Sequence, residues 1–196
     1  MQDQHRFNVR AWLIWIAGFI AFPIAGIVAE AVTGRIDDAV SALVGGLAAG
    51  AVIGAGQWLV ARRVLGDPRV WIPATAVGMG IGLLAGAWVV GYGTSLGELA
   101  LMGAITGVPL GAAQAFALRG RVTHAWVWAA AMPVLWALGW TVTTAGGIDV
   151  DRQFAVFGAY GAITFMALSG VLLDRLRAAS LPAPAVPPAP DQAAAR

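Results

Sequence analysis

One stretch of the chain, residues 46–63, reads GLAAGAVIGAGQWLVARR. Its glycines recur every four residues, so Gly46, Gly50 and Gly54 share one face of a helix. The stretch is otherwise almost entirely apolar until Arg62 and Arg63 end it. Helices in a bilayer associate through close backbone contact, and faces of small residues are typical of such packing. The stretch therefore predicts a membrane-spanning helix whose glycine face lies against another helix.

The composition of the whole chain agrees with this prediction. Of its 196 residues, 59% are hydrophobic and 11% are charged, whereas a soluble domain has about 45–50% apolar and about 25% charged residues. Too few charges remain to cover a surface that faces water, which excludes an ordinary soluble domain. The net charge is only +2, and nucleic-acid binding needs a broad basic face, so we expect no nucleic-acid partner. The absence of cysteine excludes disulfides and thiolate metal sites.

Six stretches are apolar and about 20 residues long, which is enough to cross a bilayer core of about 30 Å. The predicted spans are residues 11–33, 39–61, 70–92, 96–118, 125–145 and 154–173. They predict an all-α integral membrane protein with one transmembrane domain over residues 11–177. Residues 1–10 form its N-terminus, and the Pro/Ala-rich residues 178–196 are expected to be a disordered tail.

The arginines alternate between successive loops. In membrane proteins, the cytoplasmic loops carry the excess of basic residues. One set of loops and ends holds Arg6, Arg10, Arg62, Arg63, Arg69, Arg119, Arg121, Arg175, Arg177 and Arg196. The alternate loops hold Asp37, Asp38, Glu98, Asp149 and Asp151, with only Arg35 and Arg152. This asymmetry predicts six spans with both termini in the cytoplasm. The exclusive use of arginine, with abundant Ala and Gly, indicates a bacterial plasma (inner) membrane.

The chain also repeats itself at spacings between 55 and 59 residues. The series Gly46, Gly50, Gly54, Gln57 recurs as Gly103, Gly107, Gly111, Gln114, and again, more diverged, as Gly158, Ala162, Met166, Ser169. The tryptophans at the start of the preceding spans are Trp12, Trp71 and Trp126. The pattern predicts three helical hairpins, over residues 11–63, 69–121 and 124–177, related by a pseudo-threefold axis along the membrane normal.

The repeated unit also carries a resemblance. The sequence GAGQWLVARR from Gly54 to Arg63, followed by Arg69, Val70 and Trp71, resembles small uncharacterised bacterial multi-pass membrane proteins that repeat a Gly-x-x-Gln-x-x-x-x-Arg helical hairpin. The resemblance covers residues 12–177. It implies the multi-pass architecture and implies no particular activity.

Several polar residues are candidates for a functional site. Gln57 and Gln114 lie on the glycine faces, so we expect their amides inside the bundle with Ser169 at the same depth. Two interpretations stay open: these groups hydrogen-bond neighbouring helices, or they form a polar ring that touches a solute or a lipid headgroup. Glu30, in the first span, is an intramembrane acid and therefore a further candidate.

Two sets of side chains are expected at the membrane interface. Arginines near the ends of the even-numbered spans predict a ring that holds anionic lipid headgroups: Arg62, Arg63, Arg119, Arg121, Arg175 and Arg177. Tryptophans near the same ends predict an aromatic belt: Trp12, Trp15, Trp58, Trp71, Trp126 and Trp128.

These patterns favour a non-enzymatic polytopic membrane protein that acts as an accessory subunit or through lipid and partner contacts. The alternative is a small-solute transporter or channel with its polar ring at Gln57, Gln114 and Ser169. We expect no catalytic residues, since His5 and His124 lie outside the spans and neither a Walker A nor an HExxH motif occurs. We also expect no cofactor and no metal. The expected partners are membrane lipids, with a second membrane protein as an open alternative.

Overall fold

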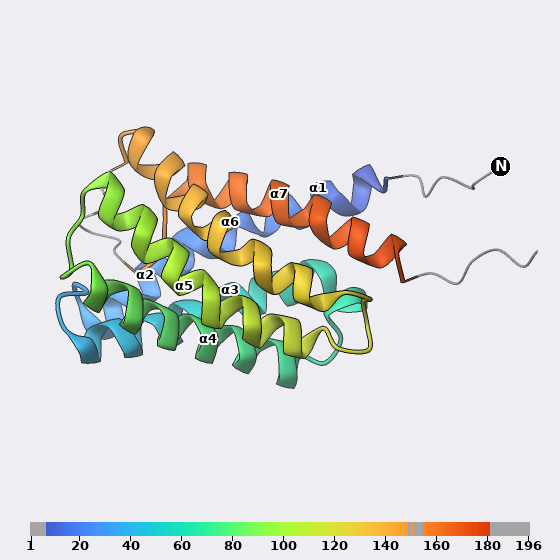
Figure 1. Cartoon of the computed structure of the whole chain (residues 1–196), viewed down its shortest axis with the longest axis horizontal. Helices are drawn as coiled ribbons and strands as arrows, with labels where there is room; N and C mark the ends of the chain where they lie inside the picture. The colour runs from blue at the N-terminus through green and yellow to red at the C-terminus, as the bar shows by residue number, and fades with distance from the viewer. Residues whose placement is uncertain (1–6, 149, 151–154, 181–196) are drawn as a thin grey trace, which may run out of the picture.

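The computed structural model describes residues 7–148, 150 and 155–180, and this part of the chain is helical (Figure 1). Its elements are α1 (Val9–Ala17), the 3-10 turn η1 (Gly18–Ile20), α2 (Ala21–Thr33), α3 (Ala39–Leu65), α4 (Pro68–Val89), α5 (Leu96–Ala117), α6 (Ala125–Ala145) and α7 (Ala159–Ala178). The first three continue one another from Val9 to Thr33 and are called here the first span. The described residues thus form six helices that are long and apolar enough to cross a membrane.

The helix ends differ from the predicted spans mainly at α3 and α7. α3 continues to Leu65, although Ala61 leaves the helical region (φ −133°, ψ 27°) and bends it. α7 begins at Ala159, five residues later than predicted. Phe157 lies just before it and is fully buried, and hydropathy cannot distinguish such a buried segment from the helix that follows. Most of the expected tail, residues 181–196, lies outside the described residues.

The helices are arranged as a ring in chain order. Each packs against the helix before it and the helix after it, and α7 packs against α1 and η1, which closes the ring. The seams between α3, α4, α5 and α6 are more extensive than the seam between α7 and the first span. α1 also touches α3, so three helices meet near the closing seam.

The glycine faces bring neighbouring helices into backbone contact. A Cβ atom on Gly46 would lie 2.8 Å from the Cα of Gly80 in α4, and one on Gly107 would lie 2.5 Å from the Cα of Pro133 in α6. Side chains essentially never approach backbone this closely, so only glycine allows these two pairs of helices to meet. The prediction that the glycine faces lie against neighbouring helices is confirmed.

The first span is interrupted where it meets α7. Pro23 has no N–H to offer the carbonyl of Phe19, and the 3-10 turn Gly18–Ile20 occupies this part of the span. A Cβ on Gly18 would lie 2.8 Å from the Cε of Met166 in α7. The proline explains why the helix changes its winding here, and Gly18 provides the space that the Met166 side chain fills.

Aromatic side chains fill the interior in the half of the bundle that lies away from the C-terminal ends of α3 and α7. Phe157 lies at their centre, with its ring centroid 4.8 Å from that of Trp136 and 5.1 Å from that of Phe22. Phe165 and Trp140 complete the group, and every member is at most 1% exposed. This half of the bundle axis is therefore occupied by packed rings.

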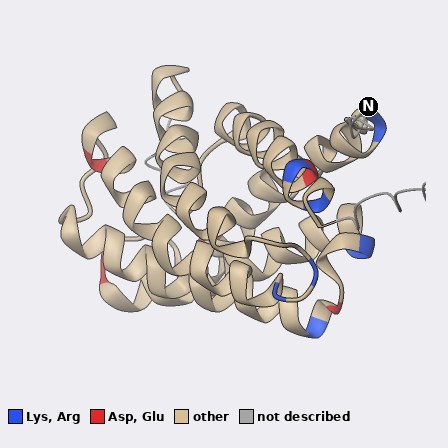
Figure 2. Cartoon of the chain, turned by 45° about the vertical axis from the view of Figure 1, so that its right-hand side comes forward, with Lys and Arg blue, Asp and Glu red and all other residues tan. Residues whose placement is uncertain are grey.

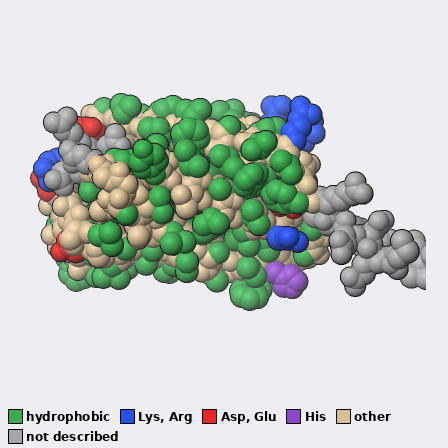
Figure 3. Space-filling model, turned by 90° about the horizontal axis from the view of Figure 1, so that it is seen from above, with side chains coloured by type: hydrophobic (Ala, Val, Ile, Leu, Met, Phe, Trp, Pro, Cys, Tyr) green, Lys and Arg blue, Asp and Glu red, His purple; other side chains and the backbone are tan. Residues whose placement is uncertain are grey.

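The charged side chains lie at the two ends of the bundle. Figure 2 shows the arginines gathered at the end where α3 and α7 finish, which we call the arginine-rich end. In the space-filling view of Figure 3, hydrophobic side chains cover the flank between the two charged ends. This distribution suits a bundle whose flank meets hydrocarbon and whose ends meet water.

Candidate functional site

A buried polar cluster lies inside the bundle toward the arginine-rich end, and Gln114 of α5 is its centre. Gln114 Nε2 donates to Gln57 Oε1 of α3 at 3.3 Å and to Thr75 Oγ1 of α4 at 3.2 Å. Gln114 Oε1 accepts from Trp128 Nε1 of α6 at 3.0 Å. All four residues are at most 1% exposed. One amide thus bonds three other helices, and both of its hydrogens are used.

Ser169 forms a second, separate group at the closing seam. Its hydroxyl accepts from Trp15 Nε1 of α1 at 3.1 Å and donates to the Met166 carbonyl of its own helix at 3.4 Å. The two groups meet through indole rings, because Trp15 packs edge-on against Trp128 with centroids 6.5 Å apart. The structure therefore brings Gln57 and Gln114 into contact and places Ser169 across an aromatic bridge from them.

Thr75 and Trp128 belong to the cluster although the sequence did not single them out for it. Thr75 donates its hydroxyl hydrogen to the Trp71 carbonyl at 2.9 Å, which leaves its lone pairs for Gln114. The available signal is that Thr75 lies within the otherwise apolar start of α4 and three residues before Gly78. For Trp128 no pattern separates a buried indole from an interfacial one.

The aromatic belt prediction is wrong for three of its six tryptophans. Trp15, Trp71 and Trp128 are 3%, 0% and 0% exposed, and they meet inside the bundle, since Trp71 also packs edge-on against Trp128 at 6.5 Å. Trp126, in contrast, is 67% exposed. An indole can lie at an interface or fill a core because it is apolar with one polar N–H, so helix rotation decides between the two.

Trp71 differs from its two neighbours in its hydrogen bonding. Its indole N–H is buried and has no hydrogen-bond partner among the described residues, whereas Trp15 and Trp128 each donate to a polar side chain. Three indoles thus close the interior beside the polar cluster, and two of them are held in orientation by a hydrogen bond.

The cluster offers hydrogen bonding and little other chemistry. Amides, hydroxyls and indole N–H groups do not ionise near neutral pH. In the polar cluster and at Ser169 they form hydrogen bonds mainly with one another. The aromatic group around Phe157 occupies the axis beyond them. This arrangement joins helices, and its packed surroundings are unlike the water-filled cavity that intramembrane polar groups line in transporters.

Glu30 lies apart from both groups. It is in the last turn of α2 and its side chain is exposed. The structure places it near the end of the bundle opposite the arginines, where it lines neither of the cavities described below.

The six arginines expected to hold headgroups occupy different surroundings. Arg62, Arg63 and Arg177 line one pocket. Arg119 lies over the ring of Phe116, 4.8 Å from its centroid, and the guanidinium of Arg121 packs against Gly66. Arg175 is exposed and does not line the pocket. The arginines therefore share one end of the bundle, and three of them line a cavity there.

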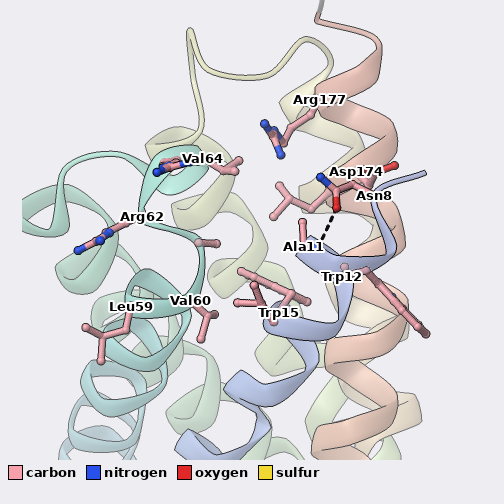
Figure 4. Close-up of a pocket in the computed structure, with 15 residues that line it drawn as sticks. Asn8, Ala11, Trp12, Trp15, Leu59, Val60, Arg62, Val64, Asp174 and Arg177 are labelled. Atoms are coloured by element: carbon pink, nitrogen blue, oxygen red, sulfur yellow. Dashed lines mark hydrogen bonds between the residues drawn. The ribbon is translucent and has the colours of Figure 1, made fainter. Parts of the chain in front are cut away.

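This pocket has a volume of about 440 Å³ and lies between α1, α3 and α7. Trp12 and Trp15 line it from α1, and Trp15 is also the donor to Ser169. In Figure 4, Arg177 extends from α7 toward the bent end of α3, while Arg62 points away. The pocket thus combines arginines at its rim with an indole that separates it from the interior.

Comparisons of the chain with models of known protein families, with curated proteins and with solved structures find no match.

Proposed function

We propose that this chain is a non-enzymatic membrane protein of the bacterial inner membrane that holds anionic lipid headgroups at its arginine-rich end and acts as an accessory to another membrane protein. One observation carries the proposal. Polar side chains inside the bundle bond to one another behind packed aromatic rings, whereas a cavity lined by three arginines opens at the bundle's end. The groups that can meet a ligand are thus the basic ones.

The proposed orientation has both termini in the cytoplasm. The described arginines at the arginine-rich end are Arg10, Arg62, Arg63, Arg69, Arg119, Arg121, Arg175 and Arg177. In bacterial membranes, loops rich in arginine stay on the cytoplasmic side, where the anionic lipid surface attracts them. The same end therefore carries the positive charge and meets the negative lipids.

The proposed architecture is three repeated hairpins around a pseudo-threefold axis. Trp15, Trp71 and Trp128 support it because they are buried together and are 56 and 57 residues apart, close to the 57 residues between Gln57 and Gln114. Trp128 donates to the helix before it, α5, and Trp15 donates to α7, the neighbour of the first span in the closed ring. The proposed repeat therefore pairs Trp15 and Trp128, rather than Trp12 and Trp126, with Trp71.

The proposal is tested by reconstituting the purified protein in liposomes and in nanodiscs. We expect the efflux of glycerol and rubidium ions to equal that of empty liposomes. We expect the melting temperature to be higher in nanodiscs containing phosphatidylglycerol than in nanodiscs of phosphatidylcholine alone, because anionic headgroups stabilise the folded arginine-rich end.

Two outcomes would overturn the proposal. Efflux that Gln57→Ala and Gln114→Ala both abolish would instead establish a transporter or channel whose path runs through the polar cluster. A melting temperature that does not depend on phosphatidylglycerol would remove the proposed role of the arginines.

A further inference from the structure

A second hollow lies on the bundle's flank next to the pocket at the arginine-rich end. This hollow has a volume of about 410 Å³ and lies between the first span and α3, with Ala17, Gly18 and Ala21 on one side and Ala55 and Gly56 on the other. Leu59 and Val60 line both cavities. The two cavities are therefore neighbours on either side of Leu59 and Val60, and we call them together the α1–α3 groove, which leads from the arginines onto the apolar flank.

Local sequence explains why the groove exists. Small residues on both walls leave space between the helices. The bend at Ala61 lets six consecutive residues, 59–64, line the pocket, whereas a straight helix would present only one face. A Cβ on Gly56 would overlap with Ala21. α3 and α2 therefore touch at these two residues, which form the floor of the groove.

The two parts of the groove differ in chemistry. The pocket at the arginine-rich end is lined by three arginines, Arg62, Arg63 and Arg177, and one carboxylate, Asp174. The hollow on the flank is lined by alanine, glycine, valine, leucine and isoleucine alone. A ligand with negative charge at one end and hydrocarbon at the other suits both parts.

We propose that the α1–α3 groove is a specific site for one anionic phospholipid, with its phosphate at Arg63 and Arg177 and one acyl chain along Ala17, Ala55 and Gly56. This inference rests on the proposed function and assigns it to a single place. Each cavity is within the size range of about 300–1,000 Å³ that ligand sites have. Arginine suits the headgroup because its planar guanidinium bonds phosphate oxygens in pairs.

The test is native mass spectrometry of the detergent-purified protein titrated with phosphatidylglycerol, phosphatidylcholine or glycerol phosphate. We expect the first phosphatidylglycerol to bind more tightly than phosphatidylcholine, and glycerol phosphate not to bind detectably because it has no acyl chain. Arg63→Gln/Arg177→Gln should weaken phosphatidylglycerol binding about thirtyfold, since each of the two arginines contributes about 1 kcal/mol near an anionic lipid surface and about 1.4 kcal/mol is a factor of ten.

The chain provides matched controls for both ends of the lipid. Arg119→Gln/Arg175→Gln removes the same charge from the same end of the bundle outside the pocket, and we expect it to weaken binding several-fold less than the pocket pair does. Ala55→Phe fills the hollow, whereas Ala112→Phe adds the same side chain two residues before the equivalent glutamine of α5, outside both cavities. Only the first should weaken binding, and circular dichroism checks that each variant is folded.

Specific outcomes overturn this site while leaving the proposed function intact. Equal losses in the two arginine pairs would show that headgroups bind the whole arginine-rich end without a single site. Equal effects of Ala55→Phe and Ala112→Phe would show that no acyl chain lies in the groove. Tight binding of glycerol phosphate would indicate an anion site without lipid. If phosphatidylglycerol binds no better than phosphatidylcholine, both the site and the proposed function fail.

Discussion

α3 and α5 differ from α7 in how the helix begins and in how it packs against the next helix of the ring. α3 and α5 both begin with a capping box, formed by Asp38 with Ser41 and by Ser95 with Glu98, whereas the N-cap of α7 is Gly158, which has no side-chain cap. α3 and α5 present glycine to the next helix, with backbone contact at Gly46 and Gly107. In α7, Met166 stands at the position that Gly54 and Gly111 hold in α3 and α5. It packs against a glycine of the first span, Gly18.

The difference shows how the position of a glycine decides whether a seam is sealed. Where glycine is repeated along the helix, two backbones meet over several turns and leave no space for a ligand. At the seam of α7 with the first span, Met166 packs against Gly18 and the indoles of Trp12 and Trp15 pack against Gly170, so these helices touch through side chains rather than through backbone. The seam of α7 with the first span, near which α3 also comes, is accordingly where the pocket opens.

The largest expected effect is at the sealed seam between α5 and α6. In Gly107→Ala, the added Cβ would lie 2.5 Å from both Pro133 Cα and Pro133 N, and neither backbone atom can move without moving α6. We expect a loss of about 3 kcal/mol in the free energy of unfolding, at the upper end of overpacking effects. Reversible unfolding in mixed micelles measures this loss.

Gly97→Ala is the control for that measurement. Gly97 lies in the first turn of the same helix with nothing within 4 Å of its Cβ position, so alanine should be neutral or slightly stabilising there. Similar losses in the two variants would mean that the seam tolerates side chains, and the contrast between sealed and open seams would fail.

The next effect compares two buried indoles. Trp128→Phe removes the donor to Gln114 Oε1, whereas Trp71→Phe removes an N–H without a described partner. Both side chains are 0% exposed, so the loss of volume is matched. We expect Trp128→Phe to cost about 1 kcal/mol more, within the range measured for hydrogen bonds between membrane helices. Equal losses would show that the bond to Gln114 contributes nothing net to stability.

A smaller effect is expected at the open seam. In Gly18→Ala, the new Cβ would meet the terminal Cε of Met166 at 2.8 Å. A methionine side chain has several rotatable bonds and can move aside, so we expect a loss below about 1 kcal/mol. The same unfolding assay decides, and a loss as large as that of Gly107→Ala would refute the distinction between the seams.

The smallest effect concerns the cap of α3. The backbone N–H of Ser41 donates to Asp38 Oδ1 at 2.8 Å and holds the pKa of that carboxyl below its ordinary value. The charged cap therefore stabilises the fold above the unfolded-state pKa of about 4, and this contribution is lost as the pH falls through the lower folded-state pKa. The melting-temperature difference between the wild type and Asp38→Asn should shrink at acid pH. A difference that is constant with pH would contradict this role.

Much of the candidate site was readable in the sequence because helix periodicity is local. Gln57 and Gln114 follow the last glycine of their stripes by three residues, which puts amide and glycine on one face, and both are buried. Ser169 is buried as well, yet its partner is Trp15. Which donor meets which acceptor depends on the rotation and neighbours of each helix, and no spacing within one helix carries that information.

The sequence by itself determined six apolar helices, the gathering of arginine in alternate loops and so at one end of the bundle, and the faces along which glycine permits close contact. These follow from hydropathy, charge and a period of 3.6 residues, which act over neighbouring residues. The tertiary structure alone decided that Trp15, Trp71 and Trp128 lie inside rather than at the interface, that aromatic rings fill the axis, and that a groove opens between α1 and α3. Those features depend on how helices that are distant in the sequence pack together, because the burial of a side chain and the volume of a cavity are set by contacts between helices.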